Sequence, residues 1–179
     1  FRDRAEGFCY INDVAVAIRY LQLHHSVRRF AILDCDLHQG NGNAVIFQDD
    51  EEVFTFSIHQ EDIYPPKERS DLDIGLDPFT DDETYLSFIR RNVPEIMTRH
   101  RPDLLVYLAG ADPFEKDVLG ALCLTKEGLS ERDRIIFNTA CEARIPVAVV
   151  LAGGYAQDVN DTVDIHYRMC LNAIEIFGT

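Results

Sequence analysis

The chain of 179 residues is long enough for one domain with a substantial core, and 46% hydrophobic and 27% charged residues are typical of a globular protein. Its net charge of −14 argues against a surface for nucleic acid or for an anionic membrane. No apolar run approaches the length of a membrane span. An acidic surface would not hinder the approach of a cationic protein tail. The simpler explanation of the charge is that it keeps the protein soluble.

The first residues are unusual for the start of a domain. The chain begins at Phe1 without an initiator methionine, and the segment 7–10 already resembles core sequence. We therefore expect a piece of a longer polypeptide. Residues 1–179 would then form a single, N-terminally incomplete domain.

The first half of the chain predicts two helices and two strands. A helix is expected from Asn12 or Asp13 to about His24, and an apolar strand then runs through Cys35. Residues 43–48 fit a short helix and residues 52–59 a second strand. The polar residues 60–78 are expected to form a long loop, of the kind that often lines a site.

The second half continues the alternation. A capping box at 80–83 opens a helix that Pro94 should kink or split. Strands are expected at 103–109 and 146–151, with a helix at about 130–143 between them. A final amphipathic helix, about 159–177, should bury an apolar stripe made of Val159, Val163, Tyr167, Cys170, Leu171 and Ile174.

Alternating helices and continuously apolar strands predict the fold class. The pattern is typical of an α/β protein with an open, mostly parallel sheet and helices on both faces. In such sheets, ligands bind outside the carboxyl ends of the strands. Polar side chains at those ends are therefore the candidate functional residues.

The first strand ends in a cluster of ionisable side chains. Asp34, Asp36 and His38 alternate, so on a strand they would point to one side. Buried carboxylates need a partner, and Asp with His suits zinc or another first-row metal if the chain bends at Gly40 and Gly42. The alternative is that backbone amides satisfy both carboxylates while His38 lies on a loop.

Three other strands also end in polar groups, namely His59, Asp112 and Tyr155. With Asp112, the residues Asp36 and His38 would make a three-ligand metal site with an open position, which is typical of catalytic zinc. Tyr155, after two glycines, could donate a hydrogen bond to a developing oxyanion. These groups suit metal-assisted hydrolysis of an amide.

Four stretches, in this order, identify a family resemblance. The chain resembles the zinc-dependent histone deacetylases of the arginase/deacetylase fold, most closely their class IV and bacterial deacetylase-like branch. The matching stretches are Gly7-Phe8-Cys9-Tyr10-Ile11-Asn12-Asp13, Asp34-Cys35-Asp36-Leu37-His38-Gln39-Gly40-Asn41-Gly42, Gly110-Ala111-Asp112 with Asp117, Leu119 and Gly120, and Gly153-Gly154-Tyr155.

The resemblance implies roles for individual residues. Asp36, His38 and Asp112 would bind one zinc ion, and Tyr155 would stabilise the oxyanion. Asp34 would orient a catalytic histidine and, with Ser57, join a monovalent cation site for K⁺ or Na⁺. A channel for the acyl-lysine stem would be lined by Gly7, Phe8, Tyr64, Leu119, Gly153 and Gly154.

Among the departures from the family pattern, two concern the catalytic histidines and the glycine loop before Tyr155. The family's tandem catalytic histidines would lie just before Phe1, so the chain alone is expected to bind zinc yet turn over poorly. Ala152 stands where the family commonly has a third glycine.

The resemblance implies a zinc-dependent deacetylase that acts on acetylated lysine in proteins. The alternatives are a hydrolase of acetylpolyamines or other small acetylated amines, and an impaired fragment that only binds acyl-lysine or a partner. We expect no direct contact with nucleic acid or membrane. The cytoplasm is the expected location, and the nucleus is the alternative for a eukaryotic member.

Overall fold

The computed structural model describes residues 1–178, which form an open five-stranded sheet in the order β3-β2-β1-β4-β5. Every pair of neighbouring strands is parallel, which confirms the predicted α/β class. The strands are β1 (Phe30–Asp34), β2 (Val53–Gln60), β3 (Leu72–Leu76), β4 (Leu104–Leu108) and β5 (Val147–Val150).

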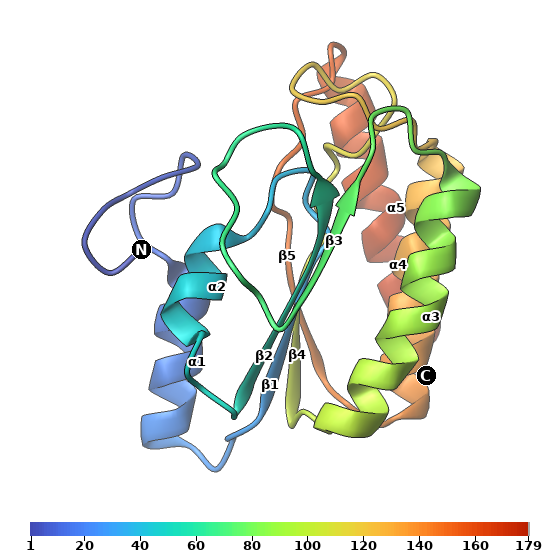
Figure 1. Ribbon diagram of the computed structural model, residues 1–179. Coiled ribbons are helices and arrows are strands. Elements are labelled where there is room, and N and C mark those ends of the chain that lie inside the picture. The colour runs from blue at the N-terminus through green and yellow to red at the C-terminus, as the bar shows by residue number, and fades with distance from the viewer. Residues whose placement is uncertain (179) are drawn as a thin grey trace.

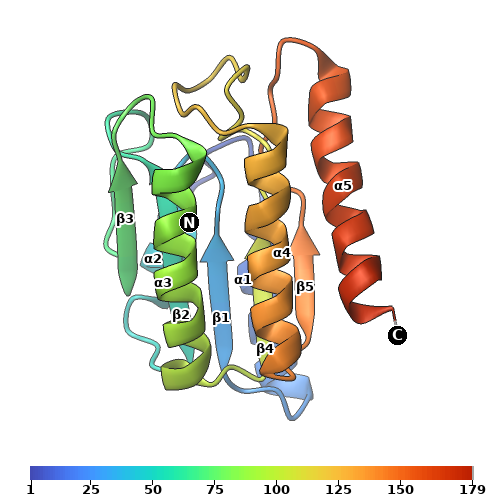
Figure 2. The same cartoon turned by 90° about the vertical axis from the view of Figure 1, so that its right-hand side faces the viewer.

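Helices cover both faces of the sheet, as predicted (Figures 1 and 2). One face carries α1 (Asp13–His24) and α2 (Asn41–Phe47). The other carries α3 (Asp82–His100), α4 (Lys126–Glu142) and α5 (Val159–Phe177). No helix in residues 1–178 is both long and apolar enough to cross a membrane.

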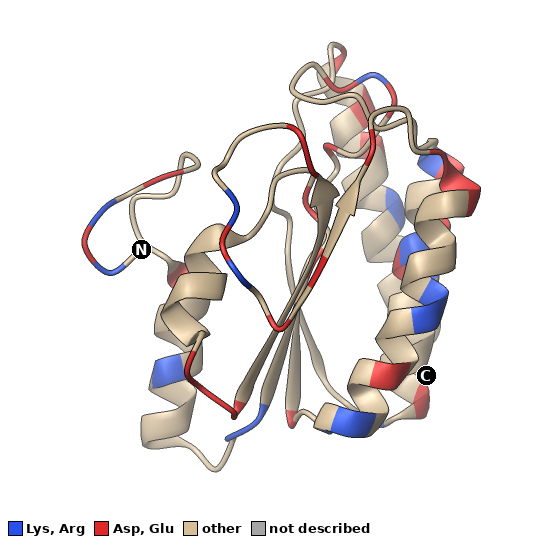
Figure 3. Cartoon of the chain, viewed as in Figure 1, with Lys and Arg blue, Asp and Glu red and all other residues tan. Residues whose placement is uncertain are grey.

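Strand β1 shows why its sequence is continuously apolar. Phe30 and Ile32 pack into the core beneath α1, whereas Ala31 and Leu33 pack into the larger core beneath α3 and α4. All four are buried because successive side chains of a strand point to opposite faces, and both faces are covered. The charged residues accordingly gather on loops, strand ends and outer helix surfaces (Figure 3).

Two segments differ from their predicted structure. Residues 60–78 are not all loop, since β3 pairs with β2 at the edge of the sheet. The sequence did not predict β3 because it contains Asp73 and Gly75, which are uncommon in strands. These residues are tolerated because β3 is an edge strand and is only partly buried. Helix α4 begins at Lys126, four residues before the predicted start, because the Thr125 side chain accepts a hydrogen bond from the Gly128 backbone N–H.

Helix α3 continues through Pro94, so the predicted split is absent. Buried side chains on both sides of the proline, among them Val93 and Ile96, attach the two halves to the core. The helix begins with Asp81, whose side chain accepts a hydrogen bond from the Thr84 N–H. Tertiary packing therefore outweighs the one backbone hydrogen bond that proline removes.

The prediction for the last helix was wrong about which face is buried. Ile165, Met169 and Asn172 are the buried residues of α5. The predicted stripe is largely exposed, including Val159, Val163, Tyr167, Cys170, Leu171 and Ile174. The reason is that α5 packs against α4, where the Asn172 side chain donates hydrogen bonds to Ser130. Helix α5 also lies beyond the edge strand β5 (Figure 2).

The two-sided burial of β1 predicts a large cost for shortening its side chains. Leu33→Ala should lower the free energy of unfolding by about 2–5 kcal/mol, because it leaves a cavity between sheet and helices. Leu23→Ala on α1 is the control, since Leu23 is 78% exposed and Leu33 is 0% exposed. Urea denaturation measures both, and equal losses would contradict the described core.

Candidate metal centre

The parallel pairing of β1 with β4 brings the two acidic loops together. Asp34 and Leu108 are register partners at the ends of these strands, and the Cys35 N–H donates to the Leu108 carbonyl at 3.0 Å. Asp36 and His38 follow β1 directly, and Asp112 follows β4. The two loops therefore leave the carboxyl edge of the sheet side by side.

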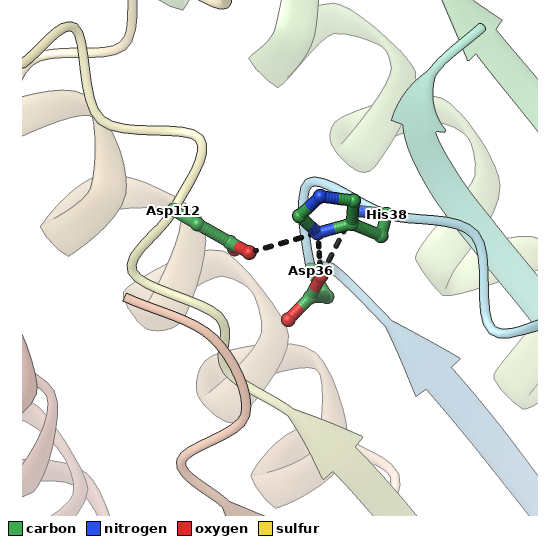
Figure 4. A group of neighbouring side chains, drawn as sticks. All are labelled: Asp36, His38 and Asp112. Carbon is green, nitrogen blue, oxygen red and sulfur yellow. Dashed lines mark hydrogen bonds and ion pairs between the residues drawn. The ribbon is translucent and has the colours of Figure 1, made fainter. Parts of the chain in front are cut away.

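Asp36, His38 and Asp112 converge beyond this edge (Figure 4). Each offers one ligand atom, and these atoms lie within 4.8 Å of one another. His38 Nδ1 is 3.1 Å from Asp36 Oδ1 and 3.3 Å from Asp112 Oδ2. The bend that a shared ion requires is present, because the strand ends at Asp34 and the His38 N–H donates back to Asp36 Oδ1.

The backbone holds both carboxylates in place. Asp112 Oδ1 accepts from the Leu37 N–H at 2.9 Å, and Asp36 Oδ2 accepts from the Gly153 N–H at 2.7 Å. A Cβ atom on Gly153 would lie 2.2 Å from Asp112 Oδ2, so only glycine fits there. The loop after β5 thus packs directly against the carboxylates of Asp36 and Asp112.

The three groups perturb one another's ionisation. The Asp112 carboxylate, 3.3 Å away, and the hydrogen-bonded Asp36 carboxylate favour the charged imidazole and raise the pKa of His38 to about 9. Burial, followed by the Asp36 charge, raises the pKa of Asp112 to about 7. Burial also disfavours the Asp36 carboxylate, but hydrogen bonds from His38 and Gly153 outweigh it, so its pKa lies below the ordinary value.

The residues fit a divalent metal ion. Asp112 Oδ2 is buried and has no hydrogen-bond partner, although it faces His38 and Asp36. An acceptor in that position is costly unless a cation completes its surroundings. Two carboxylates and one imidazole form a donor set that zinc accepts, with a fourth position left for water or substrate. The role of metal ligand remains a prediction for all three residues.

A cavity of about 670 Å³ opens over the cluster. The predicted channel residues that line it, together with Tyr155, are Gly7, Phe8, Tyr64, Leu119 and Gly153. Gly154 is the exception: a Cβ atom there would meet Thr162 and Ala111, so this glycine faces α5 rather than the cavity. Gly154 thus packs the loop against its neighbours, and its predicted place in a substrate channel stays a prediction.

Tyr155 stands at the cavity wall, with its ring centroid 6.0 Å from that of Phe8. Its backbone N–H donates to Asp117 Oδ2 at 2.6 Å, and Asp117 Oδ1 accepts from the Leu119 N–H. Asp117 therefore fixes two wall residues, a function that its place in the matching motif signalled but did not define. Upstream, Ala152 has a φ of 58°, a conformation that favours the glycine common in the family.

Asp34 and Ser57 are register partners on β1 and β2, so they lie side by side as a shared cation site would require. Asp34 is buried, and burial followed by the Asp36 charge raises its pKa well above the ordinary value. The Ser57 hydroxyl lies 2.9 Å from His59 Nδ1. His59 thus serves as a buried hydrogen-bonding partner, and the monovalent cation site remains a prediction.

The fold and this cluster define an α/β protein with a candidate mononuclear metal centre at the carboxyl edge of a parallel sheet. The chain matches the histone deacetylase domain over residues 1–170 and belongs to that family. It is 24% identical to the crystal structure of an acetylpolyamine aminohydrolase from Burkholderia pseudomallei, with a TM-score of 0.83 over 96% of this chain and 52% of the other. That likeness shows the shared fold.

Three relatives of known sequence cover most of this chain. An uncharacterised protein of Picosynechococcus is 44% identical over 99% of this chain and 59% of its own length. Histone deacetylase 2 of Arabidopsis thaliana is 31% identical, covering 86% of this chain and 41% of the relative. A histone deacetylase-like amidohydrolase of Pseudomonas aeruginosa is also 31% identical, covering 87% and 44%. The chain thus spans about half the length of these relatives.

The raised pKa of His38 predicts that metal binding releases a proton. Between about pH 7 and 9 the metal-free imidazole is protonated, whereas a metal ligand must be neutral. Zinc affinity should therefore rise about tenfold per pH unit in this range and level off above it. Competition with a zinc-buffering chelator measures this dependence. An affinity that stays constant from pH 7 to 9 would contradict the described coupling of His38 with the two acids.

Proposed function

We propose that the protein is a zinc-dependent amide hydrolase that removes acetyl or other acyl groups from lysine side chains. The convergence of Asp36, His38 and Asp112, two of which (Asp36 and His38) line one cavity, carries this proposal. Membership of the histone deacetylase domain family supports it. The domain that performs the reaction would include residues 1–179 together with family segments outside them.

A zinc ion in such a site would supply Lewis acidity, which polarises a carbonyl group and makes water more acidic. The Tyr155 phenol would donate a hydrogen bond to the amide oxygen as negative charge develops there. Burial raises the pKa of Tyr155, so its hydroxyl keeps the proton that this hydrogen bond needs. Asp34 would orient a histidine from outside these residues, which would serve as general base.

The cavity walls support a substrate with an apolar stem and a neutral amide at its end. Phe8, Tyr64 and Leu119 offer apolar surface above the metal ligands. The Tyr64 ring lies edge-on to the His38 imidazole at 6.3 Å between centroids, and its hydroxyl accepts a hydrogen bond from the Gly7 N–H. These contacts would guide a lysine stem toward the centre.

Small acetylated amines are the second candidate substrate class. The net charge of −14 suits a polyamine as well as a basic protein tail. Comparing an acetyl-lysine peptide with an acetylated polyamine distinguishes them, because the preferred class should have the higher kcat/KM. The cytoplasmic location and the structural K⁺ or Na⁺ remain predictions.

Tyr155→Phe tests the proposed oxyanion donor in the protein of full natural length. Loss of the hydroxyl should lower kcat for acetyl-lysine hydrolysis about 100- to 1000-fold and leave the zinc content unchanged. Tyr167→Phe on the exposed side of α5 is the matched control and should keep full activity. A Tyr155→Phe enzyme with unchanged kcat would remove this residue from the mechanism.

Asp112→Asn tests the metal site separately. It keeps the size of the side chain but removes the charge of a buried ligand, so both zinc content and hydrolysis should be lost. Metal analysis beside a fluorogenic acetyl-lysine assay measures both. A variant that lacks zinc yet hydrolyses the amide normally would refute the zinc mechanism.

A further inference from the structure

An arginine without an assigned role lies buried behind the metal centre. Arg132 belongs to the charged run Glu131-Arg132-Asp133-Arg134 on α4, yet Arg132 and Asp133 are both 0% exposed. Charged side chains are almost never fully buried unless they are paired and hydrogen-bonded. The contacts of this pair therefore indicate what it does.

Asp133 orients the guanidinium of Arg132. Nε and Nη2 of Arg132 donate to Asp133 Oδ1 at 3.0 and 2.9 Å, and the Tyr107 hydroxyl donates to the same oxygen. The guanidinium carbon also lies 5.7 Å from the centre of the Tyr107 ring. Two of the three guanidinium nitrogens thus donate to Asp133, and the third, Nη1, is left for other partners.

Nη1 of Arg132 reaches the backbone of both metal-binding loops. It donates to the Gly110 carbonyl at 2.8 Å and to the Cys35 carbonyl at 3.3 Å. Cys35 directly precedes Asp36, and Gly110 lies two residues before Asp112. One nitrogen therefore bridges the two loops that carry the three proposed ligands.

The hydrogen bonds from Arg132 join the two loops at a point beyond the end of the β1–β4 pairing. The register of β1 with β4 ends at Asp34 and Leu108, so the carbonyls of Cys35 and Gly110 lie beyond the last paired residues. The segments are nevertheless close there, since a Cβ atom on Gly110 would lie 2.7 Å from Asp36 Cα. A change in their spacing would separate Asp36 from Asp112 directly.

We infer that Arg132 is a positioning residue of the metal centre, which sets the spacing of Asp36 and Asp112 by bridging the carbonyls of Cys35 and Gly110. This inference rests on the proposed metal site. Arginine suits the role because its planar group donates in several fixed directions, whereas a lysine ammonium is a single point of charge. Outer partners of this kind typically change metal affinity 10- to 100-fold when removed.

The test measures binding of zinc alone, without substrate, in the protein of full natural length. Arg132→Met should weaken zinc affinity about 10- to 100-fold in competition with a chromophoric chelator. It should also alter the visible absorption of the cobalt-substituted protein, because that spectrum reports ligand geometry. Arg134→Met is the control: Arg134 lies on the same helix but pairs with Glu175 at the surface, so both readouts should match the wild type.

Arg132→Lys decides the question if the methionine variant does not fold. Its single ammonium group cannot bind Asp133 and both carbonyls at once. Zinc affinity should therefore fall below that of the wild type, by no more than the 10- to 100-fold expected when the arginine is removed. Folded Arg132 variants with wild-type affinity and cobalt spectrum would overturn the inference while leaving the metal site intact. A wild-type protein that binds no zinc would overturn the metal site itself, and this role with it.

Discussion

The crowding of buried carboxylates at the ends of β1 and β4 is the constraint on which the rest of the site depends. Asp34, Asp36 and Asp112 lie where parallel pairing brings two loops together, and the His38 imidazole lies against Asp36 and Asp112. Desolvation and mutual repulsion disfavour such an arrangement. A bound divalent cation would reverse both costs, and backbone N–H groups from Leu37 and Gly153 already orient the acids toward it.

The parallel sheet explains why this cluster could be predicted. Strands β1 and β4 are short and largely apolar, and each is followed by a carboxylate, Asp36 after β1 and Asp112 after β4. Because parallel strands direct their carboxyl ends to one edge, the sequence alone predicts that these groups meet. The family resemblance then supplied the role of Asp34, which spacing could not provide.

Other features depend on contacts that no local pattern encodes. Strand β3 contains Asp73 and Gly75 and exists because β2 offers an open edge. The amphipathic pattern of α5 was recognised, but its buried side was set by packing against α4. The run Glu131-Arg132-Asp133-Arg134 is typical of a solvent-exposed helix surface, yet its middle pair is buried beneath the metal-binding loops. Such burial follows from tertiary placement alone.

The most direct test of the central claim is X-ray absorption at the zinc edge of the purified protein of full natural length. The account predicts one zinc ion per chain with nitrogen and oxygen ligands at about 2.0–2.2 Å and no sulfur ligand. Sulfur at about 2.3 Å would assign the metal to cysteines instead of Asp36, His38 and Asp112. A folded protein that takes up no zinc would likewise contradict the account.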